Sequence, residues 1–196
     1  MYQALVIDFF GVICSEVAPH WLGRYFSPTR AEQIKATIVH AADVGDISQS
    51  TMFDQLANLA GISVPRAEAE WEAEVRIDVD MIDFVIAAAP LYKVGMLTNS
   101  PSPFVRGILR RHKLSGLFRA IVVSSEIRTA KPERRAYERI LKELGTVASA
   151  AFMIDDNPVN VAAAAKIGMK GIVFHSVDDV KRAVPVKGLP RIGDYE

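Results

Sequence analysis

Short apolar runs alternate with helix-period segments along most of the chain. Strands are predicted over 4–7, 92–97, 120–123, 150–154 and 171–174, where nearly every residue is apolar. Such strands suit a parallel sheet that is covered on both faces. Helices with apolar residues three or four positions apart are predicted over 81–88, 103–112, 133–144, 159–167 and 177–183. This alternation predicts an α/β fold, a doubly wound parallel sheet with helices on both faces.

The stretch between the first two strands breaks this alternation. Residues 28–75 show helical patterns, with helices predicted over 30–42, 51–60 and 66–75. Thr29 is the expected N-cap of the first helix, and Pro65 marks the start of the last. A helical block of this length after a single strand is typical of an insertion. We therefore predict a core of residues 1–14 and 77–196, with an all-helical cap of residues 15–76.

Polar residues follow the predicted strands at their carboxyl ends, where open α/β sheets bind ligands. They are Asp8, Thr98, Asn99, Asp155 and Asp156, together with Lys131 in a loop. Carboxylates that meet at one sheet edge repel each other unless a cation lies between them, and an all-oxygen ligand set suits Mg²⁺. A nearby lysine would keep a carboxylate ionised and would neutralise a phosphate group. The pattern therefore indicates a magnesium-dependent reaction of a phosphate.

Four segments that contain these residues resemble the motifs of the haloacid dehalogenase-like hydrolase superfamily, whose members are mostly phosphatases. The segments are VIDFFGVI (6–13), GMLTNS (95–100), AKP (130–132) and FMIDDNPVN (152–160). The helical insert is similar to the small cap that one subgroup carries after the first strand, and residues 45–48 resemble a segment of sugar-phosphate phosphatases. The resemblance implies a Mg²⁺-dependent phosphomonoester hydrolase that acts on a small, sugar-like phosphate through a phospho-aspartyl intermediate.

The resemblance also implies a role for each motif residue. Asp8 would attack phosphorus and bind the metal, and Phe10 would offer its backbone carbonyl to the metal. Asp156 is the expected direct metal ligand, while Asp155 would act through water or orient its neighbour, although the division between the two stays open. Contacts to the phosphoryl group or the rest of the substrate are expected from Thr98, Asn99, Lys131, Gly11 and Ser100.

Phe10 departs from the phosphatase pattern. Most phosphatases of the family carry a second Asp at this position, which protonates the leaving alcohol and then activates water. Glu16, His20 and Asp46 are candidate replacements. True haloacid dehalogenases carry an aromatic residue here and need no metal, so a metal-independent 2-haloacid dehalogenase is the first alternative, although the paired aspartates argue against it. A catalytically weak or inactive phosphate-binding or regulatory protein is the second.

Composition limits the partners. Lys plus Arg and Asp plus Glu number 23 each among 196 residues, so the net charge gives no reason to expect binding to nucleic acid or to a membrane surface. Cys14 is the single cysteine, which excludes an internal disulfide and fits a cytoplasmic protein. Neither a signal peptide nor a membrane span is expected. We expect a small phosphorylated substrate, a monomer or homodimer, and a loosely ordered or surface-bound tail over 185–196.

Overall fold

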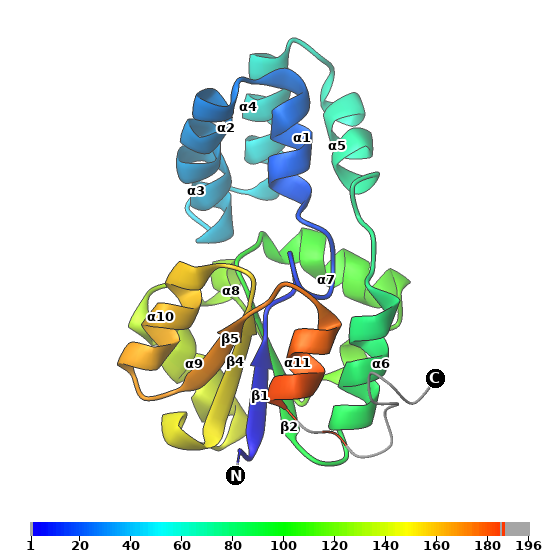
Figure 1. The fold of residues 1–196 in the computed structure, drawn as a ribbon. Coiled ribbons are helices and arrows are strands. Elements are labelled where there is room, and N and C mark those ends of the chain that lie inside the picture. The colour runs from blue at the N-terminus through cyan, green and yellow to red at the C-terminus, as the bar shows by residue number, and fades with distance from the viewer. Residues whose placement is uncertain (1, 185, 187–196) are drawn as a thin grey trace.

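The computed structural model describes residues 2–184 and 186, so the tail predicted over 185–196 lies, apart from residue 186, outside the described residues. At its centre is a parallel sheet in the order β3-β2-β1-β4-β5 (Figure 1). Its strands are β1 (Ala4–Ile7), β2 (Lys93–Thr98), β3 (Ala120–Val123), β4 (Ala151–Asp155) and β5 (Lys170–Val173). The predicted sheet is confirmed, and each strand boundary agrees with the prediction to within one residue.

The central strand β1 is buried on both faces, and all four of its residues are fully buried. Leu5 and Ile7 belong to a hydrophobic cluster shared with α6 (Val79–Ala88), α7 (Ser102–Arg111) and α11 (Val177–Ala183). The opposite face, with Ala4 and Val6, packs against helices α9 (Arg134–Leu144) and α10 (Pro158–Lys166). Because successive side chains of a strand point to opposite faces, two separate cores fix the direction in which β1 delivers Asp8.

Two local details of the core differ from the sequence prediction. The helix expected to start directly after Pro132 begins at Arg134, with Glu133 at its N-cap position. A short helix, α8 (Ser124–Ile127), follows β3, where only a loop was expected. A helix of four residues is too short to show a helical period in the sequence, so its formation depends on the packing around it.

The helices between β1 and α6 form a lobe above the carboxyl edge of the sheet (Figure 1). They are α1 (Val17–Tyr25), α2 (Pro28–Ile34), the π-helical turn η1 (Lys35–Val39), α3 (His40–Asp43), α4 (Gln49–Ala60) and α5 (Val64–Glu72). Ser27, rather than Thr29, is the N-cap of α2, because Pro28 occupies its first position. The rings of Trp21 and Trp71 lie 5.7 Å apart inside the lobe. The division of the chain at residues 15 and 76 stays a prediction.

Two connections join this lobe to the sheet, and they are hydrogen-bonded to each other. The backbone N–H of Ser15 donates to the carbonyl of Arg76 at 2.9 Å, and the N–H of Arg76 donates to Oγ of Ser15 at 3.0 Å. The N–H of Asp78 donates to the carbonyl of Ile13 at 2.9 Å. The lobe is therefore anchored close to the turn that carries Asp8. Within the described part of the chain, no helix combines the length and apolar character that a membrane-spanning segment requires.

Candidate active site

Asp8 directly follows β1 and lies beside Lys131. Lys131 Nζ is 2.7 Å from Oδ2 of Asp8 and 2.7 Å from Oδ2 of Asp155, which ends the neighbouring strand β4. The other oxygen of Asp8, Oδ1, accepts a hydrogen bond of 2.7 Å from the N–H of Phe9. All three charged side chains are buried. The predicted convergence of strand ends thus brings Asp8, Lys131 and Asp155 into direct contact.

The carboxylate of Asp155 is already engaged by protein groups. Its Oδ1 accepts hydrogen bonds of 2.9 Å from the N–H of Asn157 and from Nδ2 of Asn160. Its Oδ2 accepts the 2.7 Å bond from Lys131. Asp155 is fully buried. It therefore holds Lys131 and the start of α10 in place, which fits the orienting role that the sequence analysis left open for it.

Asp156 is differently placed, because no other described residue forms a hydrogen bond with its carboxylate. It is only partly buried and faces the cavity. Carboxylate oxygens of Asp8, Asp155 and Asp156 lie within 4.8 Å of one another. An all-oxygen donor set with one free carboxylate fits Mg²⁺, which uses one or two carboxylates and keeps several waters. Of the paired aspartates, Asp156 is the one that is free to bind a cation.

Burial makes these carboxylates unfavourable as anions. Desolvation raises the pKa of Asp8 well above its usual value, although Lys131 counteracts this. Desolvation, with contributions from Glu16 and Asp155, raises the pKa of Asp156 to about 6. Burial opposes the charge on Lys131 as well, but Asp8 and Asp155 outweigh it and raise its pKa, so the ammonium group stays charged. One cation thus faces several carboxylates, and a divalent ion would balance the excess negative charge.

The turn after β2 brings the second motif to the same edge. The side chain of Asn99 is bonded to the backbone of Lys131: Nδ2 donates to its carbonyl at 2.8 Å, and Oδ1 accepts from its N–H at 2.9 Å. The N–H of Ser100 donates to Oγ of Ser124 at 2.9 Å. Thr98 is fully buried, and its Oγ1 has no hydrogen-bond partner among the described residues. An unpaired buried hydroxyl at this place has the capacity to bind a phosphoryl oxygen.

Gly11 lies against Asp156. Its φ is +85°, and a Cβ atom at this position would lie 2.2 Å from Oδ2 of Asp156. Both the backbone conformation and the space therefore favour glycine. Gly11 and Thr98 do not line the cavity, whereas Asp8, Phe10, Asn99, Ser100, Lys131 and Asp156 do.

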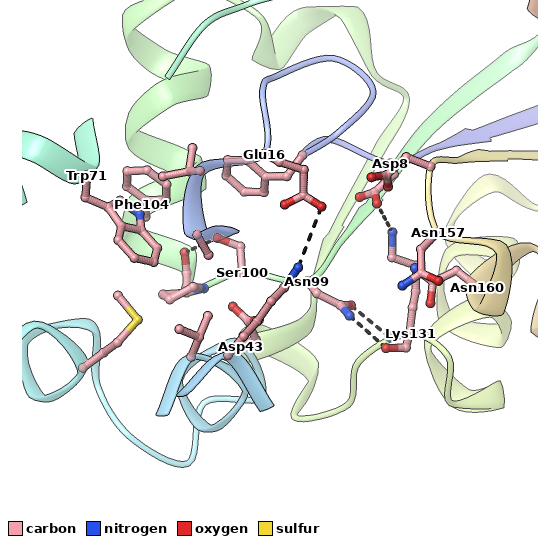
Figure 2. A pocket seen from close by; sticks show the side chains of 18 residues that line it. Asp8, Glu16, Asp43, Trp71, Asn99, Ser100, Phe104, Lys131, Asn157 and Asn160 are labelled. Carbon is pink, nitrogen blue, oxygen red and sulfur yellow. Dashed lines mark hydrogen bonds and ion pairs between the residues drawn. The ribbon is translucent and has the colours of Figure 1, made fainter. Parts of the chain in front are cut away.

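The cavity, with a volume of about 160 Å³, lies between the sheet edge and the helical lobe. Asp8, Lys131, Asn157 and Asn160 lie toward one end, and Trp71 and Phe104 toward the other (Figure 2). The continuous helix formed by α2, η1 and α3 contributes Lys35, Val39 and Asp43. These three residues recur every fourth position, so they share one face of the helix.

Charged groups of the lobe also reach the cavity. Lys35 Nζ lies 3.8 Å from Oε1 of Glu16, as the dashed line in Figure 2 shows. Burial raises the pKa of the partly buried Asp43 to about 7; Lys35 lowers this pKa, and Glu16 raises it. No hydrogen bond or ion pair to the Asp43 carboxylate is found among the described residues. Near neutral pH the Asp43 carboxyl is therefore only partly ionised.

The three candidate replacements for the acid missing at Phe10 are placed very differently. Glu16 lines the cavity. Asp46 is exposed and forms an ion pair of 2.9 Å with Arg128. Nδ1 of His20 lies 3.8 Å from Oε2 of Glu74, which also pairs with Arg24. Neither Asp46 nor His20 lines the cavity.

Several residues of the cavity were not assigned to the site from the sequence. Asn157 and Asn160 lie within the fourth motif, and this position could have identified them as residues of the site. Lys35, Asp43, Trp71 and Phe104 belong to helices without such a motif. Their helical periods indicate a buried face but do not show what that face contacts.

Comparison with known proteins agrees with this arrangement. The family model described as haloacid dehalogenase-like hydrolase matches residues 2–168. The sesquiterpene phosphatase astK from Aspergillus oryzae is 32% identical to the chain over 96 residues, which cover 49% of this chain and 48% of that protein. The match thus spans about half the length of that phosphatase.

Solved structures show the same fold. A HAD family enzyme from Bacteroides thetaiotaomicron, in complex with magnesium and inorganic phosphate, superposes with a TM-score of 0.74 at 19% identity, covering 89% of this chain and 95% of that one. An L-2-haloacid dehalogenase from Xanthobacter autotrophicus, with chloropropionic acid covalently bound, has a TM-score of 0.65 at 19% identity and covers 87% and 76%. At these identities the likeness concerns the fold and does not separate the two chemistries.

Proposed function

Because the chain belongs to the haloacid dehalogenase-like hydrolases, we propose that it hydrolyses phosphate monoesters through a phospho-aspartyl intermediate on Asp8. The observation that supports this proposal most directly is that the paired aspartates, Asp155 and Asp156, differ in their hydrogen-bond partners. Asp155 is bonded to Lys131, Asn157 and Asn160, whereas Asp156 faces the cavity without a protein partner. A reaction in which Asp8 attacks carbon has no use for this metal-binding carboxylate, whereas a cation held there would stabilise the charge of a transferring phosphoryl group.

The residues around Asp8 have complementary roles in this reaction. Asp8 attacks phosphorus while the bond to the leaving alcohol breaks. Lys131, charged and 2.7 Å from Asp8, stabilises negative charge on the nucleophile and on the phosphoryl oxygens. We assign to one of those oxygens the hydroxyl of Thr98, which is unpaired and buried outside the cavity lining, and Asn99 fixes the loop that carries Lys131. Water then attacks phosphorus, which releases phosphate and regenerates the carboxylate of Asp8.

Asp8, Asp156 and the backbone carbonyl of Phe10 would hold Mg²⁺, which supplies positive charge to the phosphoryl oxygens when bound. Asp155 acts indirectly, because its oxygens already accept hydrogen bonds from Lys131, Asn157 and Asn160. Ser100, which lines the cavity, and Gly11, which leaves room for Asp156, complete the surroundings of the phosphate.

Phe10 cannot transfer a proton, so the acid and base must come from elsewhere. We propose Glu16, the one of the three sequence candidates that lines the cavity. Lys35 Nζ lies 3.8 Å from Oε1 of Glu16 and holds this carboxyl group at the cavity. In the first step the protonated carboxyl of Glu16 would give its proton to the leaving alcohol, and the carboxylate that remains would take a proton from the attacking water in the second.

The first experiment measures phosphate release from para-nitrophenyl phosphate with Mg²⁺, using the wild-type protein and Asp8→Asn. We expect release that depends on Mg²⁺ and is lost in Asp8→Asn, together with a phosphorylated Asp8 peptide after acid quench. Asp46→Asn, an exposed carboxylate outside the cavity, is the matched control. Phosphate release that persists in Asp8→Asn would refute the mechanism.

A second experiment addresses Glu16. If it transfers protons, Glu16→Gln should slow turnover by about 10²–10⁴-fold, the usual contribution of general acid–base catalysis. Asp43→Asn, in the same cavity, provides the comparison, and His20→Gln, outside it, is the control. Equal rates for Glu16→Gln and wild type would exclude Glu16 from this role.

Phe10 favours one second candidate, the metal-independent 2-haloacid dehalogenase, because true dehalogenases carry an aromatic residue at this position. Halide release from chloropropionic acid in the presence of a metal chelator is the test. Halide release together with no phosphate release from any ester would select this chemistry over phosphoryl transfer.

The expected cytoplasmic location and the choice between monomer and homodimer belong to the same proposal. The single, buried Cys14 supports a reducing compartment. Light scattering on the purified protein distinguishes the two oligomeric states.

A further inference from the structure

The cavity has a carbon-lined end in addition to its phosphate-binding end, and the proposed reaction does not use it. Its apolar lining residues are Phe10, Val17, Val39, Met52, Trp71 and Phe104. They come from the turn after β1, from the helical lobe and from α7, so core and lobe build this wall together. In Figure 2, Trp71 and Phe104 lie on the side of the cavity away from Lys131.

The aromatic part of this wall is firmly packed. The rings of Phe10 and Phe104 are stacked, with centroids 5.8 Å apart and planes within 6° of each other. Trp71 meets Phe104 edge-on at 6.4 Å and Phe53 edge-on at 5.7 Å. Because each ring packs against others, these aromatic side chains cannot rotate away without breaking the contacts between them. The surface that they present to a ligand therefore stays apolar.

Few polar groups at this end are available for a ligand. Glu16, to which the proposed reaction assigns the proton transfers, pairs with Lys35 at 3.8 Å, and Asp43 is the lining carboxylate of the helical lobe that has no ion pair among the described residues. Since its pKa is raised to about 7 by burial, it carries only part of a charge near neutral pH. A sugar ring, with a hydroxyl on almost every carbon, would leave several hydroxyls without partners here.

The segment that prompted the expectation of a sugar-like substrate lies elsewhere. Asp46 pairs with Arg128, and a Cβ at Gly45 would lie 2.8 Å from the carbonyl oxygen of Ser125 in α8. Residues 45–48 are not part of the cavity lining. This segment therefore docks the lobe onto the core and does not contact a ligand in the cavity.

We infer that the cavity selects the monophosphate ester of a small, largely apolar alcohol, with the carbon skeleton against Phe10, Phe104, Trp71, Val39 and Met52. The inference rests on the proposed function for the position of the phosphate. Val39 and Met52 are 4% and 1% exposed, so most of the apolar surface that binding removes from water here is the ligand's own.

The test uses two phosphonates, which cannot be hydrolysed, and both carry a six-membered ring. Calorimetry measures how tightly each binds to the wild-type protein with Mg²⁺. One is the phosphonate analogue of cyclohexylmethyl phosphate, and the other is that of glucose 6-phosphate. We expect the cyclohexyl compound to bind at least about tenfold more tightly, because its ring buries apolar surface against the wall. Equal affinities, or tighter binding of the glucose analogue, would overturn the inference.

Val39→Thr places a hydroxyl in the wall at nearly constant volume. It should weaken binding of the cyclohexyl compound by about three- to tenfold, with inorganic phosphate binding unchanged. Val79→Thr, on α6 at a residue that is 68% exposed, is the matched control and should change neither. An unchanged affinity in Val39→Thr contradicts the inference. Turnover of the two esters tests the proposed function separately, because the phosphonates report selectivity whether or not hydrolysis occurs.

Discussion

Nζ of Lys131 lies 2.7 Å from Oδ2 of Asp8 and also 2.7 Å from Oδ2 of Asp155, so one ammonium group forms both ion pairs. A single buried ammonium group thus pairs with the carboxylates at the ends of two adjacent strands. Removal of one member of a buried ion pair leaves an uncompensated charge, which costs more than the loss of the pair itself. The nucleophile is therefore tied to the stability of the sheet edge.

We predict that Lys131→Met lowers the free energy of unfolding by about 3–5 kcal/mol, as is usual for a broken buried ion pair. Adding Asp155→Asn should recover part of this loss, because one of the two uncompensated carboxylates is then removed. Urea denaturation of the single and double variants measures the coupling. Arg139→Met breaks the exposed pair with Glu143 and should cost less than about 1 kcal/mol. Strictly additive effects of the two buried substitutions would contradict the shared pairing.

Magnesium should stabilise the protein against heat, because a ligand that binds the native state raises its stability by mass action. Since Asp156 is the free carboxylate of the site, Asp156→Asn should abolish most of the Mg²⁺-induced rise in melting temperature. Asp178→Asn, in the first turn of α11 and away from the cavity, is the control. A full magnesium effect in Asp156→Asn would place the ion elsewhere.

Gly11→Ala should damage the metal site more than the fold. The new Cβ would lie 2.2 Å from Oδ2 of Asp156, and φ of +85° is strained for alanine. We expect at least about tenfold weaker Mg²⁺ binding and a loss of about 1–3 kcal/mol of stability, as is usual for such strain. The matched control is Gly23→Ala in α1, where the added methyl meets no atom within 4 Å. Gly23→Ala should raise the free energy of unfolding by about 0.5–1 kcal/mol, because alanine favours the helix more than glycine does.

Asp43 should make stability depend on pH. Its pKa of about 7 in the folded protein is above the ordinary value of 3.8, so the native state binds this proton more tightly than the unfolded chain. Its contribution is therefore most favourable below about pH 4 and declines as the pH rises through 7. Lys35 opposes this effect and Glu16 adds to it.

In Asp43→Asn the pH-dependent contribution of this residue to the free energy of unfolding disappears. Relative to wild type, this variant should gain stability between about pH 5 and pH 8, by an amount on the order of 1–3 kcal/mol after allowance for the partial exposure of Asp43. Denaturant titrations at both pH values measure the difference. Parallel pH profiles for the two proteins would show that the carboxyl of Asp43 titrates normally.

Local patterns in the amino-acid sequence were enough to predict the sheet and the motif residues at its edge. Apolar strands such as Ala4–Ile7 specify a doubly covered sheet through local composition, and parallel strands necessarily bring their carboxyl ends together. The meeting of Asp8, Lys131 and Asp155 was predictable for this reason.

The substrate end of the cavity was decided only by the tertiary structure. Lys35, Val39 and Asp43 share a helix face whose period is clear, but no local rule states that this face meets Phe10 and Phe104 of the core. The different roles of Asp155 and Asp156 depend on hydrogen bonds from Lys131, Asn157 and Asn160. Such contacts, and the desolvation that raises the pKa of Asp43, arise from the packing of distant segments, and a residue's identity in the sequence does not encode them.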